Sequence, residues 1–405
     1  MTTAALEIFA ALDSPAGHAD PYPHYAALHD LGEAVRLAPG SVALVGYDAI
    51  AAVLRDPEVR HHDYAQIAEI MPEWLRHPSV NESRDWILNL DPPAHTRIRS
   101  LMSRAFTARR VAALEPAIAR MADDLLDAMA ERGSDGTPVE FMQDFAYLLP
   151  VTVICELIGI PEADRAEFRP LARAVTALFE FSDLAELTDA DKATVQLLGY
   201  FGDLATQRRA DPRDDLLSAL VSVADAGDGR LTDLELTRNL VLLLVAGFET
   251  TTNLLGNGLH IALHDPALMA ALRTGEIPVA GFVEEVLRYD SPVQAATNRV
   301  SPGFTVGGLV IEPGEGMMPL LGAGNRDPRK FSGPAEFNPR RSESGPLSFG
   351  GGAHFCVGAA LARLEAAVAF PRLLARFPAL SPAAEPVRRS GLLLRGFDML
   401  PVTIS

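Results

Sequence analysis

The ten residues Phe349-Gly350-Gly351-Gly352-Ala353-His354-Phe355-Cys356-Val357-Gly358 place one cysteine in a glycine-rich loop. Apolar residues recur at near-helical spacing from Leu361 to Leu373, so we expect a helix to begin directly after the loop. A helix N-terminus points free N–H groups and its positive dipole end at such a sulfur, which favours a thiolate. The glycines would let backbone amides and a flat cofactor approach the sulfur. The loop predicts that Cys356 binds iron, and a buried cysteine after an ordinary turn is the alternative.

All fixed positions of the pattern Phe-Gly-x-Gly-x-His-x-Cys-x-Gly are present, and in this the loop resembles the haem-binding loop of the cytochrome P450 family. The resemblance implies that Cys356 is the axial thiolate ligand of haem b, where a thiolate favours O–O cleavage. It implies that Phe349, His354 and Gly358 contact the haem. It also implies a mainly α fold with a minor β region, the triangular P450 fold, in which haem lies between a long central helix and the helix of the cysteine loop.

Composition indicates a folded globular protein. The 405 residues are 48% hydrophobic and 22% charged, with no low-complexity linker or internal repeat, so we expect a single domain over residues 1–405. The net charge of -18 and the lack of a basic stripe argue against nucleic-acid binding. The sequence contains no basic-then-apolar leader and no apolar run long enough to cross a bilayer, and its two cysteines form no disulfide framework. We expect a cytoplasmic protein that binds no membrane.

Hydrophobic periodicity predicts a mostly helical chain. We expect helices over residues 22–31, 47–54, 94–105, 109–132, 139–158, 163–181, 192–209, 214–226 and 278–289. Thr232 and Glu235 form a capping box that opens the longest helix, which runs to about His264. Short strands are expected over 41–46, between 293 and 311, and between 392 and 404.

The long predicted helix contains Ala246-Gly247-Phe248-Glu249-Thr250. A glycine inside a helix costs about 1 kcal/mol relative to alanine, and threonine is a poor helix former, so this run suggests a functional reason. Ala246 and Thr250 share a helix face, on which they would form a polar notch. The resemblance implies that Ala246 and Gly247 lie against haem and that Glu249 and Thr250 are the catalytic residues that deliver protons. A kinked core helix is the alternative.

Two departures from the family pattern occur in this run. Glu249 fills a position that is more often aspartate. Phe248 is bulky, and we expect it to narrow the pocket or to shift the acid.

Two basic residues stand four apart in Asp91-Pro92-Pro93-Ala94-His95-Thr96-Arg97-Ile98-Arg99, at the predicted start of a helix. An imidazole and a guanidinium on one face can bind carboxylates through charge-assisted hydrogen bonds. The resemblance assigns four residues to the haem propionates, namely His95, Arg99, Arg299 and His354.

Glu285 and Arg288 stand three residues apart, a spacing that is common on exposed helix faces. The segment Phe337-Asn338-Pro339-Arg340-Arg341 fits the meander of the resembled family. The resemblance therefore implies a buried structural network of Glu285, Arg288 and Arg341 under the haem loop.

The resemblance implies a monooxygenase, in which one atom of O2 enters a small-molecule substrate and the other leaves as water. Its electrons come from NAD(P)H, and because no Rossmann glycine fingerprint is present, we expect a separate ferredoxin and ferredoxin reductase. The resemblance implies that several segments of the chain surround the Cys356 side of the haem. Arginines that flank these segments would guide an acidic ferredoxin. These are Arg99, Arg104, Arg109, Arg110, Arg340, Arg341 and Arg363.

Aromatic and apolar residues outside the motifs are candidates for the substrate pocket: Trp74, Trp86, Phe179, Phe181, Val245 and Val293. If they line the cavity, they predict a large apolar or aromatic substrate, such as a polyketide or peptide-type secondary metabolite, and plain core packing is the alternative. The chain resembles bacterial members of actinobacterial type that act in antibiotic biosynthesis. Oxidative coupling or epoxidation on the same fold is an alternative. A non-catalytic haem sensor is another, but a sensor would not need Glu249 and Thr250.

Overall fold

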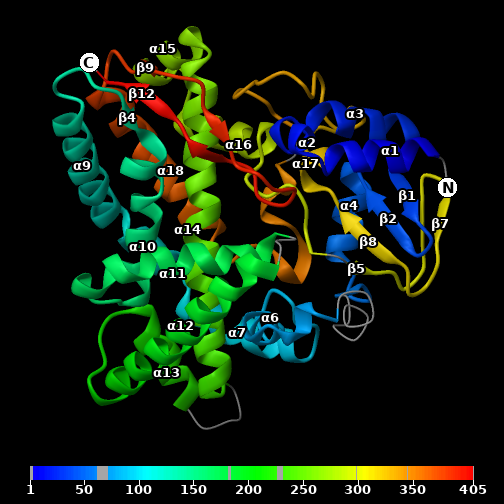
Figure 1. Ribbon diagram of the computed structural model, residues 1–405, viewed down its shortest axis with the longest axis horizontal. Helices are drawn as coiled ribbons and strands as arrows, with labels where there is room; N and C mark the ends of the chain where they lie inside the picture. Colours follow the sequence, from blue (N-terminus) through cyan, green and yellow to red (C-terminus); the bar gives the residue numbers. More distant parts are fainter. Residues whose placement is uncertain are drawn as a thin grey trace. The chain divides into compact units, whose positions relative to one another are not determined.

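The structure is a computed structural model that describes residues 3–61, 72–180, 184–225, 231–297, 299–343 and 345–404. It divides into two compact units. Unit 1 comprises Met1–His62, Ala122–Ala146 and Thr250–Ser405, and unit 2 comprises Asp63–Met121 and Tyr147–Glu249. Helices predominate and the sheets are small (Figure 1), which confirms the predicted mainly α fold with a minor β region.

Unit 1 holds the principal sheet, with strand order β1-β2-β8-β5-β3. Its strands are β1 (Ala34–Ala38), β2 (Ser41–Leu44), β8 (Gly316–Pro319), β5 (Arg299–Val300) and β3 (Arg60–His61). The β2–β8 pair is parallel and the other pairs are antiparallel. The blue helices α1 (Thr3–Leu12), α2 (Pro15–Ala19) and α3 (Tyr22–Leu31) lie beside the strands β1 and β2 (Figure 1).

Smaller β elements complete unit 1. The three-stranded sheet has the order β4-β12-β9, formed by β4 (Val139–Glu140), β12 (Pro401–Thr403) and β9 (Ser381–Pro382). Two antiparallel pairs are β6 (Phe304–Val306) with β7 (Leu309–Ile311), and β10 (Val387–Arg388) with β11 (Phe397–Met399). The further helices are α4 (Tyr47–Arg55), α15 (Pro266–Thr274), α16 (Val279–Tyr289), α17 (Leu321–Gly324) and α18 (Ala359–Arg376).

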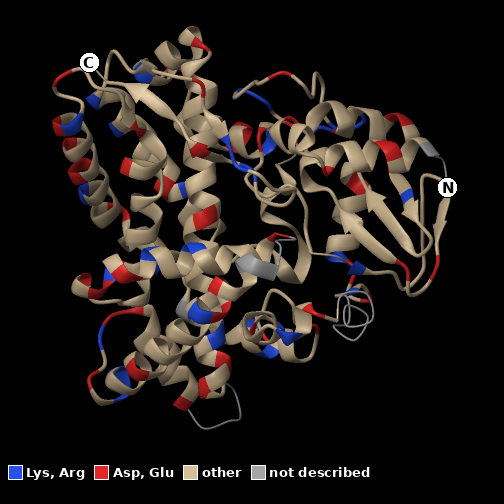
Figure 2. Cartoon of the chain, in the orientation of Figure 1, with Lys and Arg blue, Asp and Glu red and all other residues tan. Residues whose placement is uncertain are grey.

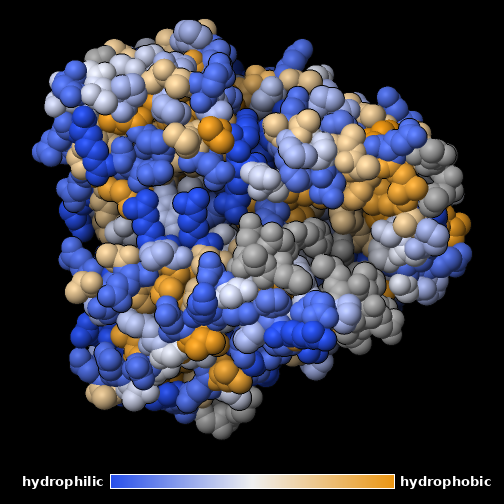
Figure 3. Space-filling view, in the orientation of Figure 1, coloured by the Kyte–Doolittle hydropathy of each residue, from blue (hydrophilic) through white to orange (hydrophobic). Residues whose placement is uncertain are grey.

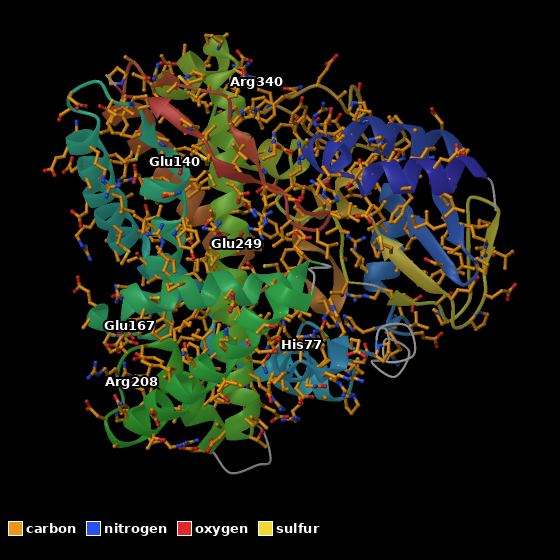
Figure 4. The ribbon with its side chains drawn as sticks, viewed as in Figure 1. His77, Glu140, Glu167, Arg208, Glu249 and Arg340 are labelled. Atoms are coloured by element: carbon orange, nitrogen blue, oxygen red, sulfur yellow. The ribbon has the colours of Figure 1, made fainter. Side chains whose placement is uncertain are left out.

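Unit 2 is built from helices. They are α6 (Pro78–Ser83), α7 (Ala94–Ala105), α8 (Ala108–Ala113), α10 (Leu148–Ile158), α11 (Arg165–Val175), α12 (Leu184–Ala210) and α13 (Leu216–Asp225), with the first parts of α9 (Glu115–Arg132) and α14 (Asp233–Leu263). Arg208 on α12, labelled in Figure 4, ties three elements together. Its Nε donates to Asp215 Oδ2 at 2.6 Å and its guanidinium also donates to the carbonyl of Gly159 at 2.6 Å.

The longest helix, α14 (Asp233–Leu263), begins with the predicted capping box. The Glu235 N–H donates to Thr232 Oγ1 at 3.1 Å, and the Thr232 N–H donates to Glu235 Oε2 at 2.8 Å. Among the described helices, α14 has the length and apolar character of a membrane span, but 83% of that apolar stretch is buried inside the protein. Burial of this kind is what a core helix requires.

Close packing in unit 1 depends on two glycines of α14. A methyl group at Gly258 would lie 2.4 Å from the Phe370 ring of α18, and one at Gly256 would lie 2.7 Å from Met142 Sδ. Larger residues at these positions would push the neighbouring elements away. Gly258 therefore sets how closely α14 approaches the helix that follows the cysteine loop, and Gly256 sets how closely it approaches Met142.

The predicted helix over residues 139–158 is wrong in its first part, which forms β4 and then a π-helix at Met142–Ala146. Val139 pairs with Val402, a partner that local periodicity cannot reveal. Glu140, labelled in Figure 4, also accepts a hydrogen bond from the Gln143 N–H at 2.7 Å. The predicted helix over 109–132 is interrupted at Leu114, because Pro116 has no N–H and the chain starts a new helix there.

Charged side chains of both signs lie along the helices, as α9 shows (Figure 2). The face seen in Figure 3 is predominantly hydrophilic, and its hydrophobic residues are scattered. Scattered exposed apolar residues are normal on a folded protein and indicate no particular partner.

A buried ion cluster joins the N-terminal helices of unit 1 to its C-terminal hairpin. Asp290, which follows α16, accepts hydrogen bonds from Tyr22 Oη at 2.6 Å, Arg395 Nε at 2.5 Å and the Arg388 guanidinium at 3.0 Å. Burial opposes the ionisation of Asp290, but the two arginine charges outweigh it and hold its pKa well below the usual range. Asn257 of α14 donates to the backbone carbonyls of Asp290 and Arg395. The cluster therefore fixes the hairpin to α14 and α16.

We predict that Asp290→Asn lowers the free energy of unfolding by about 3–5 kcal/mol, because it leaves two buried arginines without their counter-charge. Urea unfolding followed by circular dichroism measures the loss. Asp127→Asn is the control, since Asp127 pairs with Arg376 in the same unit but is exposed, and should cost about 1 kcal/mol or less. The depressed pKa means that the contribution of Asp290 is present at neutral pH and is lost as the solution is acidified below the ordinary aspartate range. Equal losses in both variants would contradict the prediction.

Candidate functional site

The cysteine loop lies at the start of α18 and presents its thiol. Cys356 is exposed, and its N–H donates to the carbonyl of Phe349 at 2.9 Å, which closes the loop. The helix begins at Ala359 with Gly358 as its N-cap, so the sulfur stands three residues before the first helical residue. The aromatic ring of Phe355 next to it is 44% exposed. An exposed thiol beside an exposed ring is suited to a large apolar group that carries a metal ion.

The glycines of this loop form its turn and its packing surface. Gly350 and Gly352 adopt φ angles of 70° and 62°, where other residues are strained. A methyl group at Gly352 would lie 2.3 Å from the carbonyl oxygen of Leu54, and one at Gly351 would lie 3.3 Å from Leu54 Cβ. These glycines therefore form the turn and let it pack against α4. A methyl group at Gly358 would lie 3.8 Å from the sulfur, which is ordinary contact.

The ring of Phe349 is supported from α18. The guanidinium carbon of Arg363 lies 4.3 Å from the centre of that ring. Arg363 also forms two hydrogen bonds with the Glu284 carboxylate of α16, at 2.5 and 3.0 Å. A bidentate pair of this kind fixes the plane of the guanidinium, and the guanidinium in turn fixes the ring.

The structure brings together the three members of the predicted charge network. Glu285 accepts from Arg288 at 2.7 and 2.8 Å and from Arg341 Nε at 2.9 Å. Arg288 is 3% exposed, and it also donates to the carbonyls of Asn325, Pro334 and Glu336, each at 2.9 Å. Arg288 thus fixes the backbone at three points of the chain before the cysteine loop.

Two polar side chains link this network to the loop itself. Asn325 accepts from the Leu347 N–H at 2.7 Å and donates to Ser348 Oγ at 2.9 Å. Ser348 Oγ donates to the carbonyl of Leu287 on α16 at 2.6 Å. The residues directly before Phe349 are therefore held by α16. No motif pointed to Asn325 or Ser348, because their partners lie 22 to 61 residues away in the chain.

The middle of α14 has one face that is open. From Asn239 to Leu259, every residue is buried except Ala246, Gly247 and Thr250. Ala246 and Thr250 are one turn apart, as the sequence predicted, and the open face consists of small side chains with one hydroxyl. Glu249, labelled in Figure 4, is 4% exposed. The partly exposed face therefore offers only small side chains to a group that lies against it.

Gly247 also has a packing role. A methyl group there would lie 3.0 Å from the side chain of Ile154 on α10, so the glycine allows the two helices of unit 2 to pack closely. Phe248 is fully buried, and its ring packs edge-on against Tyr147 with centroids 5.1 Å apart. The expectation that Phe248 narrows the pocket is wrong, because its side chain fills the core of unit 2 instead.

Tyr147 is a neighbour of Glu249 that sequence reasoning missed. Burial raises the pKa of the Tyr147 phenol, and the negative charge of Glu249 raises it further. The phenol donates to the carbonyl of Arg169 at 2.9 Å, and the guanidinium carbon of Arg169 lies 4.7 Å from the ring centre. Tyr147 lies within the helix predicted over residues 139–158 but belongs to no motif, so only the packing of α10 and α11 places it here.

The predicted propionate ligands are distributed over both units. His95 (2% exposed) and Arg99 lie one turn apart on α7 in unit 2. Arg299 (6% exposed) lies on β5 in unit 1, and His354 lies in the cysteine loop of the same unit. Each unit by itself therefore offers an imidazole and a guanidinium.

The predicted pocket residues occupy varied positions. Trp86 is buried, and its ring centre lies 5.8 Å from that of Phe179. Val245 is buried on α14, Trp74 is half-buried in a 3₁₀ turn, and Val293 forms an isolated bridge with Leu394. Phe181 lies outside the described residues.

Four of the seven arginines predicted to guide a redox partner have acidic neighbours. Arg341 bonds Glu285, Arg363 bonds Glu284, Arg340 bonds Glu276 and Arg110 bonds Asp214. Pairing of this kind reduces the local positive potential that these arginines offer to an acidic partner.

Comparisons with known proteins agree over nearly the whole chain. The family model for cytochrome P450 matches residues 31–277 and 279–395. The cytochrome P450 monooxygenase PikC of Streptomyces venezuelae is 41% identical over 393 residues, which cover 95% of this chain and 91% of the relative. The 6-deoxyerythronolide B hydroxylase of Saccharopolyspora erythraea is 37% identical over 406 residues, with coverage of 97% and 98%. The crystal structure of P450BioI with an acyl carrier protein carrying hexadec-9Z-enoic acid superimposes with a TM-score of 0.87 at 32% identity, covering 96% of this chain and 99% of that one.

The two cysteines should differ in reactivity. Cys155 is fully buried, and burial raises the pKa of its thiol to about 12, so it stays protonated at pH 8. Iodoacetamide should therefore alkylate the exposed Cys356 and spare Cys155 in folded protein prepared without cofactor, as peptide mass spectrometry would show. Labelling of both residues in urea is the control. Equal labelling in the folded protein would contradict the assignment.

Proposed function

This chain belongs to the cytochrome P450 family, and on that premise we propose that Cys356 is the axial haem ligand of a monooxygenase that oxidises a large, mostly apolar secondary metabolite. The family implies haem iron, O2 and reducing equivalents, and a haem monooxygenase activity. The ligand assignment rests on one observation: the thiol of Cys356 is exposed in a loop that a backbone hydrogen bond closes.

The residues present fit a haem. The thiol is exposed. The network of Glu285, Arg288 and Arg341 fixes the chain before the cysteine loop. The open face of α14 carries only small side chains. We propose that His95, Arg99, Arg299 and His354 bind the propionates, because imidazole and guanidinium groups form charge-assisted hydrogen bonds with carboxylates. Phe349 and Gly358 would contact the porphyrin from the loop, and Ala246 and Gly247 would contact it from α14. We propose haem b as the form bound.

The bound haem would supply oxygen activation, and the protein would supply protons and position. Hydroxylation consumes O2, two electrons and two protons, places one oxygen atom in a C–H bond of the substrate and releases the other as water. We propose that the Thr250 hydroxyl donates a proton at the open face of α14 and that the buried Glu249 carboxyl replenishes it. Ala246 and Gly247 leave the space that this transfer needs, because neither carries a side chain beyond Cβ.

Substrate class is inferred from the relatives. The hydroxylase similar to this chain acts on 6-deoxyerythronolide B, and the P450BioI structure holds a hexadecenoic acid on its carrier protein. Both are large and mainly apolar, in agreement with the aromatic residues Trp74, Trp86 and Phe179 in unit 2. We propose that Trp74, Trp86, Phe179, Val245 and Val293 are candidates for contact with the substrate.

We further propose that electrons derive from NAD(P)H through a ferredoxin and its reductase, in the cytoplasm. Because Arg340, Arg341, Arg363 and Arg110 are paired, Arg104 and Arg109 are the stronger candidates for ferredoxin contacts. The family match extends across both compact units, which supports the proposal that residues 1–405 form one functional domain.

Titration with candidate metabolites tests the proposed substrate class. Displacement of water from the haem by a fitting compound shifts the Soret band to shorter wavelength, and large polyketides should produce this shift at lower concentration than small aromatic compounds. A preference for small aromatic compounds would contradict the proposed class.

We predict that Cys356→Ser abolishes the strongly red-shifted Soret band of the reduced, carbon-monoxide-treated protein, because a hydroxyl oxygen is a poorer donor to iron than a thiolate. Absorption spectroscopy measures the band. Cys155→Ser is the matched control and should retain it, since Cys155 is buried on α10. Survival of the band in Cys356→Ser would show that another residue is the ligand.

Thr250→Ala and Glu249→Gln should retain haem but waste reducing equivalents. Proton transfer by a positioned group contributes about 10²–10⁴-fold to a rate, so we expect the ratio of product to NAD(P)H consumed to fall by roughly tenfold or more. The measurement uses any compound that gives the Soret shift. Thr252→Ala is the control, because Thr252 is on the same helix but 5% exposed and away from the open face. Unchanged coupling in the first two variants would remove both residues from the proton path.

A further inference from the structure

A buried histidine of unit 1 has hydrogen-bond partners at both ring nitrogens. His29 is 8% exposed and lies on α3, which packs against α17 (Figure 1). Its Nε2 lies 2.9 Å from the carbonyl oxygen of Ala323, and its Nδ1 lies 2.7 Å from a guanidinium nitrogen of Arg329. Ala323 belongs to α17, and Arg329 belongs to the turns that follow this helix.

These two partners determine the protonation state of the ring. A carbonyl oxygen only accepts hydrogen bonds and a guanidinium only donates them, so Nε2 of His29 carries a hydrogen and Nδ1 carries none. The ring is therefore held as one neutral tautomer. A protonated ring would turn a second N–H toward the guanidinium donor, so uptake of a proton breaks the hydrogen bond between His29 and Arg329.

The surroundings of His29 favour the neutral ring. The charged groups that act on it are Arg329 and Asp327, from the turns after α17, and Asp30, its neighbour on α3. Asp327 is 2% exposed and already accepts a hydrogen bond from Arg329 Nε at 2.8 Å. Burial lowers the pKa of His29 below its ordinary value and Arg329 lowers it further, whereas the Ala323 carbonyl and the two carboxylates oppose this shift without cancelling it.

The turns that bind His29 also fix the chain before the cysteine loop. Asp327 accepts from the N–H of Tyr47, the first residue of α4, at 2.8 Å. Asn325, two residues earlier, accepts from the Leu347 N–H at 2.7 Å. A loss of the contact with α3 would therefore reach a segment on which both α4 and the cysteine loop depend.

We propose that His29 is an acid-sensitive switch of unit 1, which binds Arg329 as a neutral ring and releases it as an imidazolium. Release loosens the turns after α17. No motif identifies His29, because Arg329 lies 300 residues away in the chain. The folded ring takes up a proton less readily than the unfolded one, so the stabilisation is present above pH 6.5, the ordinary pKa of the ring, and is lost as the pH falls below it.

Urea unfolding of the full-length protein at pH 7.5 and pH 5.0 compares wild type with His29→Gln. Glutamine can donate to the Ala323 carbonyl but takes up no proton. Between these pH values the equilibrium constant of unfolding should rise at least about threefold more for wild type than for His29→Gln, and about thirtyfold is the limit for a folded ring that takes up no proton. His24→Gln, at a half-buried histidine of α3, is the control and should keep the wild-type pH dependence. Equal pH dependence of wild type and His29→Gln would overturn the proposal.

Nitrogen NMR of ring-labelled histidine measures the switch directly and decides the question if His29→Gln does not fold. At pH 7.5 the spectrum of His29 should show a protonated Nε2 and an unprotonated Nδ1. Arg329→Gln should raise the pKa of His29, because it removes the neighbouring positive charge and leaves Asp327 without its guanidinium partner. A protonated Nδ1 at pH 7.5, or a pKa that Arg329→Gln leaves unchanged, would refute the proposal.

Discussion

The buried network of Glu285, Arg288 and Arg341 is the interaction on which the site depends. Arg288 reaches three backbone carbonyls, and Glu285 also accepts from the N–H of Asn338, so the network orders a long stretch of irregular chain without regular secondary structure. Buried charges tolerate little displacement, because moving one partner leaves the other uncompensated in a low-dielectric surrounding. Hydrogen bonds of Asn325 and Ser348 connect this network to the residues directly before the cysteine loop, so the segment that carries Cys356 begins at a fixed position.

Small residues serve two purposes along α14. Gly256 and Gly258 let other elements of unit 1 pack tightly against the helix, and Gly247 does the same for Ile154 in unit 2. Ala246, Gly247 and Thr250 also form its open face. Glycine and threonine lower the helix propensity at these positions, and close packing of neighbouring elements offsets part of that cost. The small residues are thus explained by packing as well as by function. A mid-helix glycine by itself therefore does not distinguish a catalytic helix from a tightly packed one.

The predictions from sequence differ in how well they survive. The mainly α class, the capping box of α14 and the helix over Ala94–Ala105 are confirmed, because each depends on contacts within one or two helical turns. The helix expected over 139–158 failed at β4, whose partner strand lies near the C-terminus. Phe248 was misjudged for the same reason, since its ring packs against Tyr147, the residue that precedes α10. Local patterns carry no information about such distant partners.

The sequence by itself determined the family. The six fixed positions around Cys356 and the run from Ala246 to Thr250 are short contiguous motifs, so they can be recognised without knowledge of the fold. It also identified which residues are candidates for binding and proton transfer. Only the tertiary structure decided which arginines are occupied by acidic partners, that Tyr147 adjoins Glu249, that His61 lies opposite Arg299, and that His29 bonds Arg329. These relations arise from strand register and helix packing between segments that are far apart in the chain. A short sequence pattern does not specify which distant residue will lie opposite a given position.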